Sequence, residues 1–232
     1  MPQNLLSAKP PVFTASGDQQ GLPLAVALLL APMVLLQVLQ SVMPAQWGDE
    51  LIVTWGLALF PGGSFDPDRL YTLVTSIFLH DGWLHLFFNG FWIATLGTLI
   101  CRLLGGWRFV AFFLLCALGG NLLQVAATWG QPYLAIGASG GVFGLLAGFG
   151  HMSVAPPWLP PRRRLQKLAA YTLAMAALNF AFAFVGGGVP GSGDAGIAWQ
   201  AHAGGFLAGL LLFPPLAAGP LREMARRAME QI

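Results

Sequence analysis

Two glycine-rich apolar segments constrain the fold of this chain more than any other feature of its sequence. In the first, residues 137–148, glycines recur every four residues at positions 140, 144 and 148. In the second, residues 201–209, Ala201, Gly205 and Gly209 repeat that spacing. Positions four apart share one face of a helix, and small residues there let two helices approach closely inside a membrane. We therefore expect two helices that pack against each other along these faces.

Each of these faces begins beside a residue that could take part in catalysis. Ser139 directly precedes the first face, and His202 directly follows the start of the second. Facing helices would bring the two side chains together below the membrane surface, as a nucleophile and its base. In the alternative interpretation, Ser139 only permits close packing or caps its helix, and His202 is a neutral histidine hydrogen-bonded between helices. Ionisable residues within membrane segments are rare and usually functional, which favours the pair.

The composition predicts an all-α protein that crosses a membrane several times. Charged residues make up 9% of the 232 residues, against about 25% in ordinary soluble domains. Six apolar runs are each near the roughly 20 residues that a spanning helix needs. They are Leu22–Met43, Trp83–Leu104, Trp107–Trp129, Ser139–Ala155, Leu165–Val185 and Trp199–Pro214. The sequence therefore predicts a six-transmembrane-helix bundle.

The distribution of Lys and Arg predicts how this bundle is oriented. With six spans both termini lie on one side, and every Lys and Arg of the chain except Arg69 falls on that side. Loops rich in Lys and Arg stay in the cytoplasm. Both termini are therefore predicted to be cytoplasmic, and Ser139 and His202 begin their helices from the opposite side.

The predicted membrane domain covers residues 21–217, between a polar cytoplasmic tail at 1–20 and a basic cytoplasmic tail at 218–232. Its long connection, residues 44–79, mixes acidic side chains with several Trp and Leu residues, so we expect it to lie at the membrane interface. The loop Gly186–Ala198 is rich in glycine, and we expect it to act as a movable cap.

A third segment, His80–Asn89, opens the second apolar run. His85 and Asn89 are four residues apart and share a helix face. Imidazole and amide groups are typical oxyanion-hole donors, although a hydrogen bond that only holds two helices together is the alternative. His80 falls on a different face and nearer the water, where it would brace the long connection or simply lie at the interface. His151, near the cytoplasmic end of its helix, is interpreted as structural.

Several other chemistries lack the residues that they need. The sequence contains no His-Glu-x-x-His pair for a zinc protease and no aspartate inside an apolar run for an aspartyl dyad. It has no basic patch with interleaved aromatics that would indicate nucleic acid. We therefore expect no metal, no cofactor and no nucleic-acid partner, and catalysis by a Ser–His dyad without a carboxylate.

Taken together, three motifs resemble those of the rhomboid family of intramembrane serine proteases. They are His80, His85 and Asn89 at spacings of five and four, Gly137-Ala138-Ser139-Gly140, and Ala201-His202 followed by Gly205 and Gly209. The resemblance covers about residues 21–217. It implies a six-helix rhomboid bundle with a membrane-embedded first loop and a water-filled cavity open to the non-cytoplasmic side.

The resemblance also implies the roles of individual residues. Ser139 would be the nucleophile and His202 the general base, while His85, Asn89 and the Ser139 backbone N–H would stabilise the oxyanion. Supporting positions would be His80, Gly137, Gly140, Phe143, Ala201 and Gly205. The implied partners are the lipid bilayer and transmembrane protein substrates, which family members cut in or near the membrane.

Two positions depart from the family pattern. Many relatives carry Trp-Arg in the first loop, where this chain has Tyr71-Thr72, and the departure concerns how that loop is anchored. The residue four after the serine is often Tyr, and here it is Phe143. A phenyl ring can still stack on His202, but it lacks the hydroxyl group.

Two alternatives to a protease remain open at this point. A rhomboid-like pseudoprotease would bind or escort transmembrane segments without cutting them, but such relatives usually lack the serine or the histidine. A transporter would use His85 and His202 as a proton relay, and Ser139 would then not be labelled covalently. The leading hypothesis is an intramembrane serine endopeptidase in a bacterial inner membrane.

Overall fold

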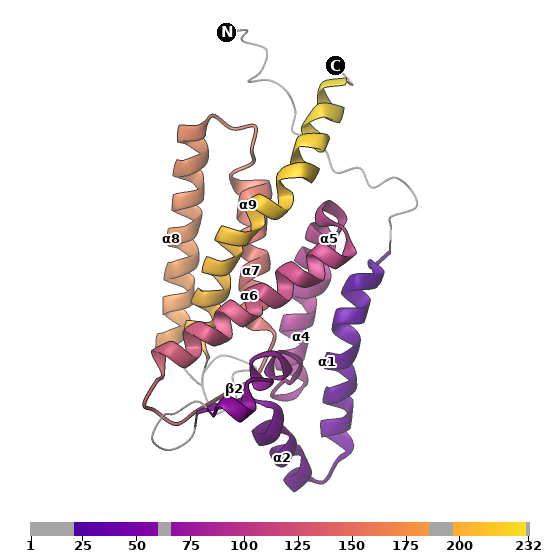
Figure 1. The fold of residues 1–232 in the computed structure, drawn as a ribbon, viewed down its shortest axis with the longest axis vertical. Coiled ribbons are helices and arrows are strands. Elements are labelled where there is room, and N and C mark those ends of the chain that lie inside the picture. Colours follow the sequence, from indigo (N-terminus) through magenta and orange to yellow (C-terminus); the bar gives the residue numbers. More distant parts are fainter. Residues whose placement is uncertain (1–20, 60–65, 186–196, 231–232) are drawn as a thin grey trace.

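A helix covers each of the six apolar runs of the sequence (Figure 1). The computed structural model describes residues 21–59, 66–185 and 197–230. The helices are α1 (Leu24–Val42), α4 (Gly82–Trp92) continued by the π-helical turn η5 (Ile93–Gly97) into α5 (Thr98–Leu104), α6 (Gly106–Ala127), α7 (Ser139–Phe149) continued by the π-helical turn η6 (Gly150–Val154), α8 (Pro161–Val185) and α9 (Trp199–Glu230). The chain is therefore the all-α membrane protein that its composition predicts.

Four helical segments in the described part of the chain are long and apolar enough to cross a bilayer. They are residues 24–42, 82–104, 106–127 and 199–223. The helix α7 is shorter, at 11 residues before its π-helical turn, and α8 begins with Arg162, Arg163 and Arg164. The number of six spans therefore stays a prediction, although all six helices lie in one bundle.

The arrangement of the helix ends fits an even number of crossings. The first residues of α1 and the last residues of α9 lie at the same end of the bundle (Figure 1). The opposite end carries α2 (Ala45–Trp55) and the start of α7. The polar tail predicted at residues 1–20 and most of the cap predicted at 186–198 lie outside the described residues.

The centre of the bundle is built from α6, α7 and α9, which touch backbone to backbone. A Cβ atom at Gly205 of α9 would collide with the carbonyl oxygen of Gly140 on α7. A Cβ atom at Gly209 would lie 2.6 Å from the carbonyl oxygen of Gly144, and one at Gly204 would lie 2.5 Å from that of Gly119 on α6. The predicted packing of the two small-residue faces is therefore confirmed.

The last helix is longer than the apolar run that predicts it. The run ends at Pro214, but α9 continues to Glu230 through three internal prolines. Each proline removes a backbone N–H from the helix, which normally costs stability. Beyond the first two prolines, Ala217 and Leu221 are buried in the core. This packing offsets the lost hydrogen bonds and keeps the chain helical.

The long connection between α1 and α4 is folded rather than irregular. Its described parts are α2, strand β1 (Leu57–Leu59), the 3-10 turn η3 (Pro67–Arg69), the short helix α3 (Thr72–Thr75) and the 3-10 turn η4 (Ser76–Phe78). No residue of α2 is buried, and Trp47, Val53 and Trp55 are exposed on it. Exposed tryptophan on a short helix is what an element at the membrane interface needs.

The carboxyl end of α2 is anchored by side chains from the turns that follow it. The Arg69 guanidinium donates to the carbonyl oxygens of Val53 and Thr54, the second at 2.9 Å. The Tyr71 hydroxyl donates to the Thr54 carbonyl at 3.0 Å, and the Thr75 hydroxyl donates to the Trp55 carbonyl at 2.7 Å. This chain has Tyr71-Thr72 in place of the Trp-Arg pair of the resembled family. Its first loop is nevertheless anchored, through Arg69 and Tyr71.

A two-stranded antiparallel sheet, which the sequence did not predict, joins this loop to the segment before α7. Strand β1 pairs with β2 (Tyr133–Ala135), with Leu57 opposite Ala135. Both strands are only three residues long. The sheet fixes the chain four residues before Ser139, so the first loop helps to set where α7 begins.

Candidate active site

The first turns of α7 and α9 bring Ser139 and His202 together. The Ser139 Oγ atom lies 2.9 Å from His202 Nε2. The glycine contacts between the two helices place these residues at the same level of the bundle, as the sequence predicts. His202 is buried, with 7% of its surface exposed. A hydroxyl group at hydrogen-bond distance from a buried imidazole is the arrangement that an activated serine requires.

The ring of His202 is held between α7 and α8. On one side it stacks on Phe143, with 4.2 Å between ring centroids and 9° between the planes. The phenyl ring therefore takes the stacking position that the family resemblance implies, without a hydroxyl group. At the other ring nitrogen, His202 Nδ1 lies 3.2 Å from Asn179 Oδ1 of α8.

Asn179 was not among the predicted site residues, although the sequence contains a signal for it. Asn179 is the one strongly polar side chain in residues 173–185, an otherwise apolar stretch of α8. A lone amide in an apolar membrane helix is expensive unless it meets a partner. The partner here is the imidazole of His202, for which the sequence predicts no carboxylate partner.

Gly137 brings the backbone close to His85, just before α7. Its φ angle is +120°, a conformation that residues with a side chain rarely adopt. A Cβ atom here would lie 2.8 Å from His85 Nε2. The Gly137 N–H donates to the Ser76 carbonyl at 2.9 Å, which ties this turn to the first loop. Only glycine therefore fits between His85 and the start of α7.

The hydrogen bond at His85 Nδ1 indicates which ring nitrogen carries the proton. The backbone N–H of Asp81 donates to His85 Nδ1 at 3.3 Å. A neutral imidazole that accepts at Nδ1 carries its proton on Nε2, the nitrogen beside Gly137. His85 can therefore donate a hydrogen bond toward the turn that precedes Ser139.

Asn89 lies one helical turn after His85 and is buried. Its Nδ2 atom donates to the His85 carbonyl oxygen at 3.1 Å, within α4. An amide nitrogen carries two hydrogens, so this bond leaves a second N–H that could serve an oxyanion.

His80 is buried, which corrects the expectation that it lies nearer the water. Only 1% of its surface is exposed, and its ring packs edge-on against His85 with 5.0 Å between centroids. Burial, with a smaller contribution from the neighbouring His85, lowers the pKa of His80 to about 3. The contact between the two rings is therefore one between His85 and a neutral imidazole near pH 7.

The N-terminus of α7 offers backbone donors beside Ser139. The first N–H groups of a helix have no intrahelical partner, and the N-cap residue of α7, Ala138, makes no side-chain hydrogen bond to them. The helix dipole also makes this end slightly positive. The Ser139 N–H therefore lies where an oxyanion formed at its own side chain could be stabilised.

Replacing Gly137 by alanine tests the close contact with His85. We expect Gly137→Ala to lower kcat by about 10²-fold, because even a small displacement of an oxyanion donor is costly. Gly130→Ala is the matched control, since Gly130 also has a positive φ, of +85°, but a Cβ atom there meets nothing within 4 Å. Steady-state cleavage assays with thermal unfolding of both variants would separate the two effects. Equal kcat values in the two variants would contradict this role.

Comparison with known proteins identifies the family. A family model described as the Rhomboid domain matches residues 67–218, about two thirds of the chain. The chain belongs to the rhomboid family. The matched region contains Ser139, His202, His85, Asn89 and Asn179.

Three of the curated relatives of this rhomboid illustrate the extent of the similarity. Rhomboid-type serine protease 2 of Emericella nidulans is 32% identical over 162 residues, which cover 66% of this chain and 29% of the relative. Rhomboid protease GluP of Bacillus subtilis is 27% identical over 202 residues, 86% of this chain and 37% of the relative. Rhomboid-like protease 3 of Toxoplasma gondii is 29% identical over 165 residues, 71% of this chain and 57% of the relative. The chain therefore spans less than two thirds of the length of each of these relatives.

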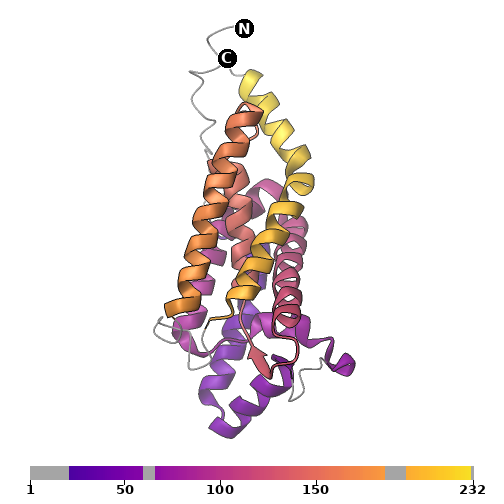
Figure 2. The ribbon, with the colours of Figure 1, turned by 90° about the vertical axis from the view of Figure 1, so that its left-hand side faces the viewer.

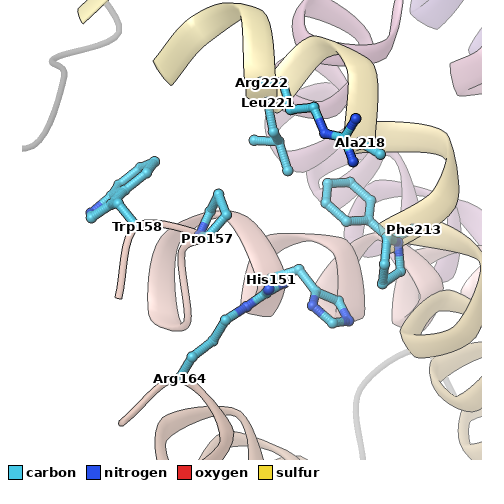
Figure 3. A pocket seen from close by; sticks show the side chains of 9 residues that line it. His151, Pro157, Trp158, Arg164, Phe213, Ala218, Leu221 and Arg222 are labelled. Atoms are coloured by element: carbon cyan, nitrogen blue, oxygen red, sulfur yellow. The ribbon is translucent and has the colours of Figure 1, made fainter. Parts of the chain in front are cut away.

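A pocket of about 290 Å³ lies at the other end of α7 in this rhomboid (Figure 3). It is lined by His151, Pro157, Trp158, Arg164, Phe213, Pro214, Ala218, Leu221 and Arg222. At 1.5 Å per helical residue, His151 lies roughly 18 Å along the helix from Ser139, so the pocket is not part of the candidate active site. His151 Nε2 lies 3.1 Å from the Leu210 carbonyl, and its ring stacks on Phe213. These contacts to α9 agree with a structural role for His151.

Proposed function

We propose that this rhomboid is an intramembrane serine endopeptidase that cleaves transmembrane segments of membrane proteins. The observation that carries the proposal is the 2.9 Å contact between Ser139 Oγ and His202 Nε2, at the facing ends of two glycine-packed helices. The family membership and the names of the relatives, which are rhomboid proteases, support the same reaction class.

In the proposed reaction Ser139 Oγ attacks the carbonyl carbon of the scissile peptide bond, and its proton passes to His202 Nε2. The Ser139 N–H, His85 Nε2–H and Asn89 Nδ2–H stabilise the tetrahedral oxyanion. The C–N bond then breaks as His202 protonates the leaving amine, which leaves an ester on Ser139. Water, deprotonated by His202, attacks the ester; the bond between the acyl carbon and Ser139 Oγ then breaks, Oγ takes the proton back from His202, and the new carboxyl group is released. The reaction needs no metal or cofactor.

The proposed substrates are helices that reach the site from the bilayer. An intact helix hides its carbonyl groups in hydrogen bonds, so it must unwind near Ser139 before attack. Water must also reach a site below the membrane surface, which requires a water-filled cavity within the protein. We propose that this cavity opens to the non-cytoplasmic side of a bacterial inner membrane, with both termini in the cytoplasm. The positions of Lys and Arg support this orientation.

A covalent probe tests the proposal without knowledge of the substrate. A fluorescent fluorophosphonate should label the detergent-solubilised protein, and Ser139→Ala and His202→Ala should each abolish the label. Ser153→Ala is the matched control, because Ser153 is exposed on η6, at the far end of the same helix. Labelling that persists in Ser139→Ala, or is absent from folded wild type, would overturn the proposal and favour a pseudoprotease that only binds transmembrane segments.

A further inference from the structure

Asn179 stands apart from the rest of α8. This helix lies at the edge of the bundle, beside α7 and α9 (Figures 1 and 2). Among its residues with described side chains, 161–181, Asn179 is the one buried residue, with 7% of its surface exposed. Its neighbours Leu178 and Phe180 are 43% and 58% exposed. Tyr171 and Met175 of α8 also pack against the bundle but are only partly buried, so the amide of Asn179 is the most completely enclosed of the described α8 side chains.

Two hydrogen bonds fix the orientation of that amide. Asn179 Nδ2 donates to the Trp199 carbonyl oxygen at 2.9 Å, in the first turn of α9. A carbonyl oxygen can only accept, so the NH2 group must face Trp199 and Oδ1 must face His202. Asn179 Oδ1 then lies 3.2 Å from His202 Nδ1. The second contact is therefore an N–H to O hydrogen bond, with the imidazole as the donor.

This bond selects the tautomer of the imidazole. An amide oxygen is only an acceptor, so Nδ1 carries the proton and Nε2 presents its lone pair. That lone pair faces Ser139 Oγ at 2.9 Å. The opposite tautomer would lose the bond to Asn179 and could not accept the serine proton. Phe143 confines the ring plane by stacking, but an apolar ring cannot distinguish the two nitrogens.

We propose that Asn179 is the positioning residue that completes a Ser139–His202–Asn179 triad, by holding His202 in the tautomer that acts as a base. The inference rests on the proposed serine protease function. In Ser–His–Asp enzymes the third residue orients the imidazole in the same way, through Nδ1–H. Here a neutral amide on a neighbouring helix takes that place. Removing it leaves His202 beside Ser139 and stacked on Phe143, but without the acceptor that Asn179 offers to Nδ1.

Asn179→Leu tests the role, because leucine has a similar size but neither accepts nor donates a hydrogen bond. We expect kcat and the rate of fluorophosphonate labelling to fall about 10- to 100-fold, with KM little changed. This loss is smaller than the roughly 10⁴-fold loss in enzymes whose triad carboxylate is replaced, because an amide carries no charge. Asn179→Asp keeps an oxygen toward His202 Nδ1 but loses the N–H that Asn179 donates to the Trp199 carbonyl, so it should recover part of the rate. Leu178→Ala, at the exposed neighbour, is the matched control and should react like the wild type.

The ¹⁵N NMR signals of the His202 ring distinguish positioning from a purely structural role. In wild type and Asn179→Asp we expect a single neutral tautomer with the proton on Nδ1, and in Asn179→Leu a mixture of both tautomers. A single tautomer and an unchanged labelling rate in Asn179→Leu would overturn the inference. Equal loss of rate in the Leu and Asp variants without a change in tautomer would also overturn it. The NMR readout does not depend on activity, so a wild type that proves unreactive would refute the protease while leaving this hydrogen bond measurable.

Discussion

Ser139→Ala should lower kcat for cleavage of a transmembrane substrate by about 10⁴-fold or more, and His202→Ala should do nearly the same. Alanine at 139 removes the atom that forms the acyl-enzyme. Alanine at 202 leaves the Ser139 hydroxyl without the base 2.9 Å away. We expect both variants to fold, because the glycine contacts between α7 and α9 remain, although His202→Ala removes a buried ring and should be the less stable of the two. The measurement is single-turnover cleavage in proteoliposomes, with circular dichroism to show that each variant is folded.

The double variant makes this prediction sharper. When two residues act in the same step, removing the second costs little once the first is gone. The Ser139→Ala, His202→Ala double variant should therefore be no slower than the slower single variant. Losses that multiply would mean that the two residues act independently, and the dyad would be wrong. Ser153→Ala, on the same helical segment as Ser139, should cleave at the wild-type rate.

The pairing of Ser139 with His202 could be predicted because each of these residues lies at the start of a small-residue helix face. The small residues at four-residue spacing give each helix one flat face, and a flat face can be buried only against another helix. Because α7 and α9 run in the same direction, the residues at the start of each face then lie close together. The 2.9 Å contact follows from this register, and Gly140 and Gly205 enforce it by direct backbone contact.

Contacts between segments that share no repeated sequence pattern could not be predicted in the same way. The β1–β2 sheet joins two segments of three residues, too short for their sequence to show a strand pattern. His80 was expected nearer the water because it precedes the apolar run, but it is buried, with its ring packed edge-on against His85. Asn179 contacts His202 because α8 packs beside α9, and the residue periodicity of neither helix predicts that contact.

The second large effect concerns the packing that creates the site. Gly205→Leu should destabilise the protein by about 3 kcal/mol or more, at or beyond the upper end of ordinary overpacking. The reason is that the new side chain would meet the carbonyl oxygen of Gly140, a backbone atom held within α7, rather than a flexible side chain. The helices can relieve this contact only by moving apart. Unfolding of the detergent-solubilised variant, followed by circular dichroism, measures the loss.

The same substitution should also separate Ser139 from His202, because both helices carry one member of the pair. We therefore expect Gly205→Leu to lose fluorophosphonate labelling at temperatures where it is still helical. Gly219→Leu is the matched control, since Gly219 is on the same helix and a Cβ atom there meets nothing within 4 Å. That variant should unfold and label like the wild type. If Gly205→Leu were as stable and as reactive as Gly219→Leu, close contact between α7 and α9 would not be what holds the serine against the histidine.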